Sequence, residues 1–480
     1  MSDASAGHLW PGDSAAALSW QGVATGYRDL RSEVARAAEL LAELPGDEPV
    51  ALIPHKSPAG LALVAACTRI ERPCLLLPVD LGARSRAALL DQAGCRFLLR
   101  ADARTVEEVG APAAVPDLDG VGLLLTTSGS TGTPKIVPLP RRATAAFIDW
   151  AATEFGIGPG TVVFSYAPLN FDLSLLDVWT TLAKGGHVVL AEQDRAVDGK
   201  YLLSVFTEAA VEVVQAVPLF FRLLLDAADG RRFPAVRELV TTGEAMPPAL
   251  AARLPDAFPN ARLRNVYGST ETNDSFIHDI DPVSGLATPI GTPIAGVRAL
   301  VVRDGQVLTG AGAGELWTAT PFQSGRYLDP ALTARSWVEA PAGAGTYFRT
   351  GDNVTRDADG VLRLDGRSDF QVKVRGVRTN LLEVEHIVTA HPAVHEAVVL
   401  GLPDDVAGHR LHAVVRLCPD ATLNSVQLRQ HCAARLPRTA IPSTMDIVVD
   451  PFPASPNGKV DRAAIQASAR EGVREHVAAR

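Results

Sequence analysis

A short segment rich in glycine and hydroxyl groups is the first stretch of the sequence that could bind a charged ligand. Residues 123–139 read LLLTTSGSTGTPKIVPL, an apolar run that is interrupted by hydroxyls, two glycines and one lysine. Glycine lets backbone N–H groups converge on one point, and the hydroxyls and Lys135 add neutral and charged donors. Such a cluster of donors suits a polyphosphate. The alternative is an ordinary Ser/Thr/Gly surface turn.

This loop differs from two common phosphate-binding patterns. The pattern GxxxxGK[ST] has no match, because Lys135 follows Pro134 and the Gly458–Lys459 pair is followed by Val460. A GxGxxG fingerprint opening a helix is also missing at this point. A phosphate-binding role therefore needs support from the rest of the chain.

The elements that must position the loop alternate between strands and helices. Helical spacing over residues 27–44, 58–70 and 84–94 alternates with short apolar runs at 48–55, 72–80 and 95–101. The same rhythm returns between about residues 161 and 268, with candidate strands at 161–169, 186–192, 211–217 and 237–243. Strands this apolar, joined by helices, predict parallel sheets covered on both faces.

The pattern changes towards the C-terminus. From Gly314 short strands and turns predict a β-rich subdomain, and near Asp369 a small C-terminal unit begins. We therefore expect an α/β fold with two domains. A large N-terminal core of parallel α/β sheets with the β-rich subdomain would cover residues 1–367. A small, mobile C-terminal α+β domain would cover residues 368–480.

Composition excludes several classes of protein. The 480 residues are 47% hydrophobic and 21% charged, with a net charge of −9, which argues against nucleic acid or an anionic membrane as the main partner. No run of about 18 apolar residues is present, and the N-terminus lacks the pattern of a secretory signal. The five cysteines form no CxxC pair, and we expect most of them to be buried thiols in a reducing cytoplasm.

Seven motifs in a fixed order resemble the adenylate-forming superfamily, which includes nonribosomal peptide synthetase adenylation domains, acyl-CoA synthetases and luciferases. TTSGSTGTPK (126–135) resembles the phosphate loop of that superfamily. The other motifs are FDLS (171–174), NVYGSTET (265–272), GELW (314–317), FRTGD (348–352), GRSDFQVKVRG (366–376) and PNGKVDR (456–462). The alternative is that all seven are ordinary turns.

The resemblance implies a binding site for ATP and Mg²⁺. Tyr267 would offer a flat face to adenine, Thr270 a hydroxyl near the α-phosphate, and Glu271 a carboxylate for Mg²⁺. Asp352 would accept hydrogen bonds from both ribose hydroxyls, with assistance from Arg367. The remaining implied ATP-binding residues are Thr127, Ser128, Gly129, Ser130, Thr131, Gly132 and Lys135 around the phosphates, together with Gly243, Glu244, Asn265, Val266 and Gly268. Taken alone, Glu271 would be an exposed loop acid.

The resemblance also implies the residues that act on the substrate. Lys459 would stabilise the charge that builds where a carboxylate meets the α-phosphate, although PNGKVDR alone would be a basic turn. Asp172 occupies the position that binds the substrate ammonium in amino-acid-activating members, whereas a lone aspartate before a helix is usually an N-cap. The implied pocket consists of Asp172, Leu173, Leu176, Gln215, Val240, Thr242, Val266, Asp274, Ser275 and Lys459. This mostly apolar wall suits a small or medium side chain.

These motifs predict an amino acid–carrier-protein ligase that works through an aminoacyl adenylate. TETNDSF resembles free-standing ligases that load proline onto carrier proteins, and Asp274 leaves room for a hydroxylated or amino-bearing side chain or a β-amino acid. The chain ends soon after PNGKVDR, so we expect a stand-alone enzyme of nonribosomal peptide or antibiotic biosynthesis. It would load the phosphopantetheine thiol of a separate carrier protein.

The second step implies a rotation of the small domain. By resemblance, Asp369 would be the hinge, and QVKVRG would face the thiol. One alternative is an acyl-CoA ligase for a small carboxylic acid, with free coenzyme A as the acceptor. Another is a catalytically silent adenylate-binding module, against which the intact Lys459, Glu271 and Asp352 argue.

Overall fold

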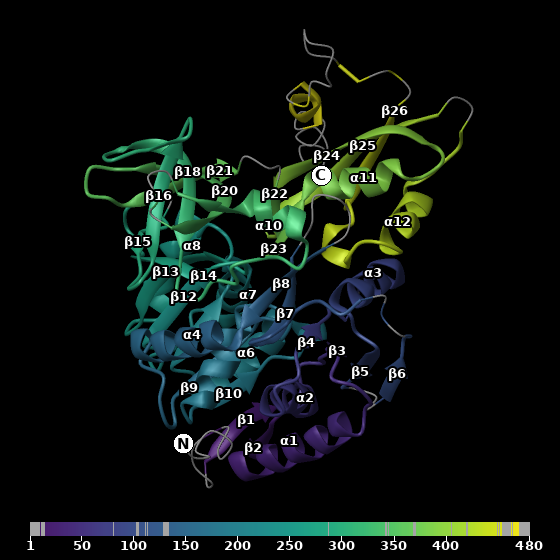
Figure 1. Cartoon of the computed structure of the whole chain (residues 1–480). Coiled ribbons are helices and arrows are strands. Elements are labelled where there is room, and N and C mark those ends of the chain that lie inside the picture. The colour runs from purple at the N-terminus through teal and green to yellow at the C-terminus, as the bar shows by residue number, and fades with distance from the viewer. Residues whose placement is uncertain are drawn as a thin grey trace. The chain divides into compact units, whose positions relative to one another are not determined.

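The computed structural model describes most of the chain as two compact units (Figure 1). The described residues are 10, 15–79, 81–101, 105–110, 112, 114–127, 134–286, 288–340, 343, 345–367, 371–404, 406–418, 421–448, 450, 452–453, 462 and 464–469. The first unit consists of the described residues within 1–79, 88–127 and 135–368. The second unit consists of the described residues within 80–87, 128–134 and 369–480. The division expected between residues 367 and 368 stays a prediction, because residues 368–370 lie outside the described chain.

A nine-stranded sheet is the largest part of the first unit. Its strand order is β15-β14-β13-β12-β11-β9-β10-β1-β2. Strands β1 and β9 to β13 run parallel, and β2, β14 and β15 are antiparallel additions at the edges. The bounds are β1 (Ala16–Trp20), β2 (Val23–Gly26), β9 (Val162–Ser165), β10 (His187–Leu190), β11 (Val213–Ala216), β12 (Glu238–Thr242), β13 (Arg262–Ser269), β14 (Asn273–Asp279) and β15 (Thr292–Pro293). The predicted parallel sheet is therefore confirmed, with antiparallel strands at its edges.

Both faces of this sheet are covered, because alternate strand residues point to opposite sides. Val163 and Val213 share a core with Phe147 of α4 (Arg141–Glu154). Their chain neighbours Phe164 and Val214 pack instead with α6 (Gly199–Glu208) and α7 (Pro218–Ala228). Shorter helical segments follow the strands at η1 (Leu175–Thr180), α5 (Thr181–Ala183), η2 (Gln193–Arg195), α8 (Pro248–Ala251) and α9 (Leu254–Ala257).

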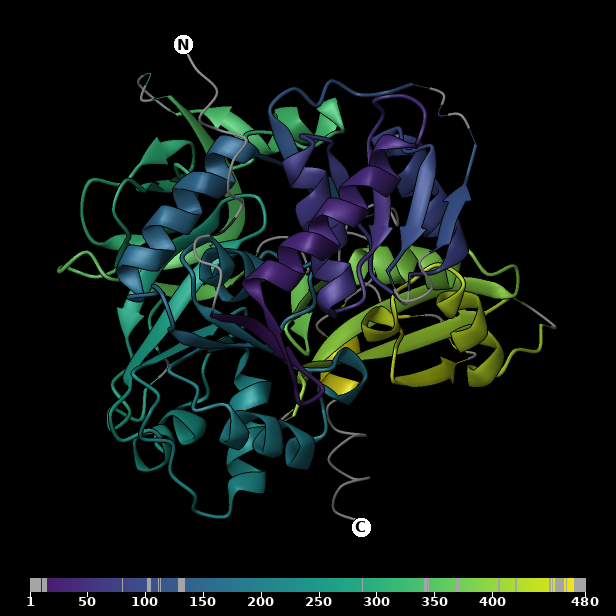
Figure 2. The ribbon, with the colours of Figure 1, turned by 90° about the horizontal axis from the view of Figure 1, so that it is seen from below.

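A second, six-stranded sheet carries the two strands on either side of the glycine-rich loop. Its order is β6-β5-β3-β4-β7-β8. The bounds are β3 (Val50–Ile53), β4 (Cys74–Leu76), β5 (Phe97–Arg100), β6 (Thr105–Glu108), β7 (Val121–Thr127) and β8 (Lys135–Pro140). Helices α1 (Tyr27–Ala42) and α2 (Pro58–Arg69) lie side by side, and α3 (Ala83–Ala93) follows β4 in the chain (Figures 1 and 2). Leu30 of α1 and Leu61 of α2 contribute to one apolar core with Val50.

The β-rich subdomain begins earlier than the sequence pattern indicated. Its sheet has the order β17-β16-β18-β20-β19, with β21 paired to β20, and it starts at Arg298 rather than Gly314. The run RALVVR forms a hairpin with β17 because Asp304 and Gly305 adopt positive φ angles and reverse the chain, and its other edge pairs with β18. The bounds are β16 (Arg298–Arg303), β17 (Gln306–Val307), β18 (Gly312–Ala319), α10 (Pro330–Ser336), β19 (Trp337–Glu339), β20 (Thr346–Arg356) and β21 (Leu362–Arg367).

The second unit is a smaller α+β arrangement. Its sheet has the order β23-β22-β25-β24, with β26 paired to β25. The bounds are β22 (Gln371–Val374), β23 (Val377–Asn380), α11 (Leu381–Thr389), β24 (Val394–Asp404), β25 (Gly408–Leu417), α12 (Ser425–Ala433), η4 (Arg438–Ala440) and β26 (Thr444–Val448). Val384 of α11 and Leu428 of α12 pack on Val399 and Ala413, so both helices cover one face of the sheet. Among the described helices, none has the length and apolar composition needed to cross a membrane.

Candidate active site

The predicted phosphate loop lies between two paired strands of the six-stranded sheet. Thr127 at the end of β7 pairs with Lys135 at the start of β8. Within the described residues, the Thr127 hydroxyl oxygen is buried and has no hydrogen-bond partner. Ser128, Gly129, Ser130, Thr131 and Gly132 lie outside the described residues, so their role as phosphate ligands stays a prediction.

The FDLS segment forms a compact turn that leads into η1. The Leu175 N–H donates to the Asp172 carbonyl at 2.9 Å, and the Ser174 hydroxyl donates to the Phe171 carbonyl at 2.7 Å. One Asp172 carboxylate oxygen accepts from the Leu173 N–H at 3.1 Å. The N-cap residue of η1 is Ser174 rather than Asp172. Asp172 is therefore not the N-cap residue itself, and its carboxylate accepts a backbone N–H in the turn that precedes η1.

The strand register gathers the predicted substrate wall on one face of the nine-stranded sheet. Gln215 of β11 lies opposite Val240 of β12, and Thr242 lies opposite Val266 of β13. Residues opposite each other, and residues two apart along a strand, share a face. Val240 and Val266 also belong to the same apolar core as Leu176 of η1. Four of the predicted wall residues thus share one sheet face, and Leu176 packs against it.

Two further predicted wall residues lie on β14. Asp274 pairs with Gly268, two residues beyond Val266, and Ser275 is fully buried. Asp274 keeps part of its surface exposed, yet protein surrounds the carboxyl closely. Burial is the main cause that raises the pKa of Asp274 to about 8, and the negative charge of Asp172 is the second cause. This carboxyl is therefore mostly protonated at neutral pH and can donate a hydrogen bond.

The residues assigned to the nucleoside meet beside β13. The Tyr267 hydroxyl donates to the Asp352 carboxylate, and the Asp352 N–H donates to the Thr350 hydroxyl at 3.0 Å. Asn265 is buried, and its amide donates to the Pro289 carbonyl at 2.8 Å. Arg367 pairs with Asp352 through the backbone of β20 and β21, and its side chain is outside the described atoms.

Three more predicted ATP-binding residues lie in the turns after β12 and β13. Gly243 and Glu244 follow the last residue of β12, and Gly243 has a φ of +84° that glycine adopts without strain. Thr270 lies between β13 and β14. All three lie beyond the carboxyl ends of parallel strands, where open α/β sheets bind ligands.

Glu271 is a buried carboxylate with a specific partner, not an exposed loop acid. It is 1% exposed, and one of its oxygens accepts from the Tyr327 hydroxyl at 2.6 Å. Among the described residues, no group of three or more His, Cys, Asp or Glu side chains could hold a metal. A single carboxylate fits Mg²⁺, which keeps several waters and adds positive charge at phosphates. Glu271 would hold that ion.

Tyr327 was missed by the sequence analysis although it contacts two predicted site residues. Besides its bond to Glu271, its ring lies beneath the Lys135 ammonium, 5.2 Å from the ring centroid. The segment QSGRYLDP has no periodic pattern or spacing that relates Tyr327 to either residue. The implied catalytic Lys459 and the implied hinge Asp369 lie outside the described residues.

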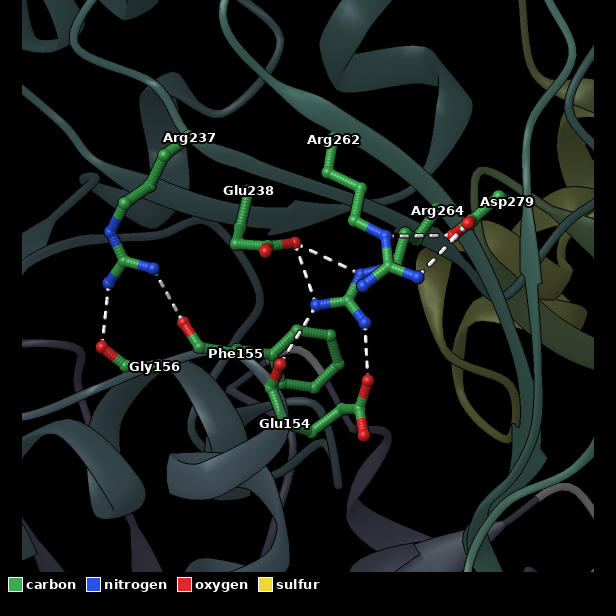
Figure 3. Close-up of polar contacts among 8 residues, drawn as sticks. All are labelled: Glu154, Phe155, Gly156, Arg237, Glu238, Arg262, Arg264 and Asp279. Carbon is green, nitrogen blue, oxygen red and sulfur yellow. Dashed lines mark hydrogen bonds and ion pairs between the residues drawn. The ribbon is translucent and has the colours of Figure 1, made fainter.

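A buried ion-pair network lies next to the predicted substrate wall on the same face of the sheet. Figure 3 shows the polar contacts of this network. Arg264 lies opposite Val240 on β13, is fully buried, and forms ion pairs with Glu154 and Glu238. Its guanidinium also lies 4.6 Å from the centroid of the Phe155 ring. The network fixes β13 against the end of α4, two residues before Val266.

A second pair of buried ionisable side chains, Lys56 and Asp177, lies near the FDLS segment. Lys56 is 2% exposed and donates to the Ser165 carbonyl at 2.6 Å, while Asp177 of η1 is fully buried. Burial lowers the pKa of Lys56, and the charge of Asp177 opposes that effect. Burial raises the pKa of Asp177, and Lys56 again opposes it. Burial is the larger effect for both side chains and favours their neutral forms, and the charge of each one offsets part of that effect for the other.

Two family models match the chain. AMP-binding enzyme matches residues 100–328, and AMP-binding enzyme C-terminal domain matches residues 383–459. The chain is 33% identical to an L-proline–[L-prolyl-carrier protein] ligase of Pseudomonas fluorescens, over 72% of this chain and 68% of the relative. It is also 33% identical to phosphinothricin tripeptide synthetase PhsB of Streptomyces viridochromogenes, over 94% of this chain. The chain spans only 40% of that synthetase.

A solved structure shares the architecture. The amide bond synthetase McbA from Marinactinospora thermotolerans superposes with a TM-score of 0.82 at 25% identity, over 94% of this chain and 97% of McbA. The fold and the order of the motifs both indicate the same family. The similarity to a carrier-protein ligase over most of this chain also indicates that family. This chain belongs to the family of AMP-binding enzymes, the adenylate-forming ligases.

Proposed function

We propose that this chain uses ATP and Mg²⁺ to convert a small amino acid into its aminoacyl adenylate and then loads a carrier protein. In the first step a carboxylate oxygen of the amino acid bonds to the α-phosphorus, and pyrophosphate leaves. In the second, the phosphopantetheine sulfur bonds to the acyl carbon, and AMP leaves. The carrier would act in nonribosomal peptide or antibiotic biosynthesis.

The observation that supports this proposal is the place of Asp172 in the turn that leads into η1, near enough to Asp274 for its charge to raise the pKa of that carboxyl. The Asp172 carboxylate belongs to the turn that opens η1, and Leu176 of η1 packs with Val240 and Val266. A carboxylate next to a mostly apolar surface suits an ammonium group attached to a short carbon skeleton. The likeness to a proline–carrier-protein ligase supports the same class of substrate.

The chain's own residues have separate tasks in this proposal. Asp172 binds the substrate ammonium and so orients the carboxylate, and Tyr267 and Asp352 bind the nucleoside. Protonated Asp274 offers a hydrogen bond to a polar group of the side chain. Lys459, brought by a C-terminal domain of residues 368–480 that turns about Asp369, stabilises charge at the α-phosphate.

Amino-acid-dependent exchange of pyrophosphate into ATP tests the first step. A panel of amino acids and of acids without an amino group should show exchange led by small amino acids such as proline or alanine. Asp172→Ala should abolish exchange while ATP still binds, because a buried ammonium would lose its carboxylate. Asp226→Ala, at an exposed ion pair with Arg253, is the matched control. Exchange supported only by acids without an amino group would contradict the proposal.

The alternative is an acyl-CoA ligase for a small carboxylic acid. It differs in the acceptor, so loading of a phosphopantetheinylated carrier and formation of a free CoA thioester should be measured in parallel. Thioester formation with CoA alone would favour the alternative. Binding of ATP without any exchange would favour a silent adenylate-binding module.

A further inference from the structure

Tyr327 connects two predicted site residues that are far apart in the sequence. Its hydroxyl donates to a carboxylate oxygen of Glu271 at 2.6 Å, and the Lys135 ammonium lies 5.2 Å from its ring centroid. Glu271 is the candidate Mg²⁺ ligand, and Lys135 borders the candidate phosphate loop. One side chain therefore contacts both the acidic and the basic part of the candidate site.

The Tyr327 ring is held firmly in place. The residue is 3% exposed, and its ring meets the Trp337 ring edge-on at a centroid distance of 4.9 Å. Its N–H donates to the Thr333 hydroxyl at 3.0 Å. Thr333 belongs to α10, whose start is capped by the Asp329 carboxylate. The hydroxyl consequently reaches Glu271 from a fixed position.

The segment around Tyr327 also ties together the two elements that it contacts. The Ser324 N–H donates to the Glu271 carbonyl at 2.9 Å, and the Ser324 hydroxyl donates to the Pro138 carbonyl at 2.8 Å. The Leu328 N–H donates to the Ile136 carbonyl at 3.1 Å. Residues 324–328 thus link β8 to the turn that carries Glu271.

We infer that Tyr327 is a positioning residue, whose hydroxyl holds the Glu271 carboxylate for Mg²⁺ and whose ring supports the Lys135 ammonium. The inference rests on the proposed adenylation reaction. A hydrogen bond to an ionised acceptor is stronger and more directional than a neutral one, and a cation is attracted to the face of an aromatic ring. Partners that orient a metal ligand typically change metal affinity about 10- to 100-fold when they are removed.

Tyr327→Phe removes the hydroxyl and keeps the ring. Tyr27→Phe is the matched control, because Tyr27 is fully buried and its hydroxyl donates to the Gly186 carbonyl at 2.7 Å. ATP binding should be measured by calorimetry with Mg²⁺ and with EDTA, and exchange should be measured against Mg²⁺ concentration. Tyr327→Phe should raise the Mg²⁺ requirement about tenfold or more and leave ATP binding in EDTA unchanged. Tyr27→Phe should change neither.

Two results would overturn the inference while the proposed function stands. In the first, the wild type exchanges pyrophosphate and Tyr327→Phe has the same Mg²⁺ requirement as Tyr27→Phe. In the second, Tyr327→Phe in a Glu271→Gln background causes a further, additive rise in that requirement. If Tyr327 acts only by positioning Glu271, adding Tyr327→Phe to Glu271→Gln should not raise the Mg²⁺ requirement further. A wild-type chain that neither binds ATP nor exchanges pyrophosphate would refute the proposed function and this inference together.

Discussion

Replacing Arg264 by methionine tests the buried ion-pair network beside the predicted substrate wall (Figure 3). Arg264 is 0% exposed, whereas the side chains of its partners Glu238 and Glu154 are 13% and 33% exposed. Methionine has a similar length but removes the charge and every hydrogen bond that the guanidinium donates. Both carboxylates and the Glu154 carbonyl would lose a donor.

The expected loss of stability follows from this burial. Removing one member of a buried ion pair destabilises proteins by about 3–5 kcal/mol. Because both glutamates retain some contact with solvent, we expect about 3 kcal/mol, at the low end of that range. The entropy of unfolding is about 2.1 cal/mol/K per residue, so for the first unit of about 350 residues it is about 0.7 kcal/mol/K. The melting temperature should therefore fall by about 4 °C.

Arg262→Met provides the matched control, two residues earlier on the same strand. Its ion pair with Asp279, at 3.0 Å, has side chains that are 55% and 61% exposed. Exposed pairs contribute about 0–1 kcal/mol, so its melting temperature should fall by about 1 °C or less. Differential scanning calorimetry of the full chain measures both variants. If both variants lowered the melting temperature equally, or if Arg264→Met did not lower it, the claim that burial makes the Arg264 ion pairs more stabilising would be refuted.

Three further predictions concern other parts of the chain. Because the pKa of Asp274 is raised to about 8, the folded state holds a proton that the unfolded state releases above about pH 4, so stability should fall as the pH rises towards 8. Melting curves between pH 5.5 and 9 should therefore decline more steeply for the wild type than for Asp274→Asn, and parallel curves would contradict this. Lys56→Met should destabilise the chain by about 1–3 kcal/mol in urea unfolding, because Asp177 would stay buried without the neighbouring positive charge. The added Asp177→Leu should recover most of that loss, and a double variant no more stable than Lys56→Met would disprove the pairing. Asp369→Pro should leave pyrophosphate exchange largely intact but stop carrier loading, because proline fixes φ where a hinge must rotate, and equal losses in both assays would argue against a hinge.

The order of elements was predictable because local sequence determines it. Apolar runs of strand length between amphipathic helices predicted the parallel sheets, and β3, β5, β9 and β11 lie inside the expected ranges. The antiparallel edge strands were not predicted, because strand direction depends on pairing and not on the composition of a segment. The start of the β-rich sheet was misjudged for a similar reason, since RALVVR belongs to that sheet through its pairing with β17 and β18.

The sequence alone also indicated the family and most candidate residues, because the motifs are short segments whose chemistry depends on a few neighbouring side chains. The register of β11 to β13 then places Gln215, Val240, Thr242 and Val266 on one face. The positions of Lys459 and Asp369 stay predictions from resemblance.

Only the tertiary structure revealed the contacts between distant segments. The bond from Tyr327 to Glu271 joins residues 56 positions apart, and the pair of Arg264 with Glu154 joins residues 110 positions apart. The raised pKa of Asp274 likewise depends on burial and on the charge of Asp172, about which the sequence around residue 274 carries no signal. Hydrogen bonds and charges act over a few ångströms of space, so their partners become defined only when folding brings those segments together.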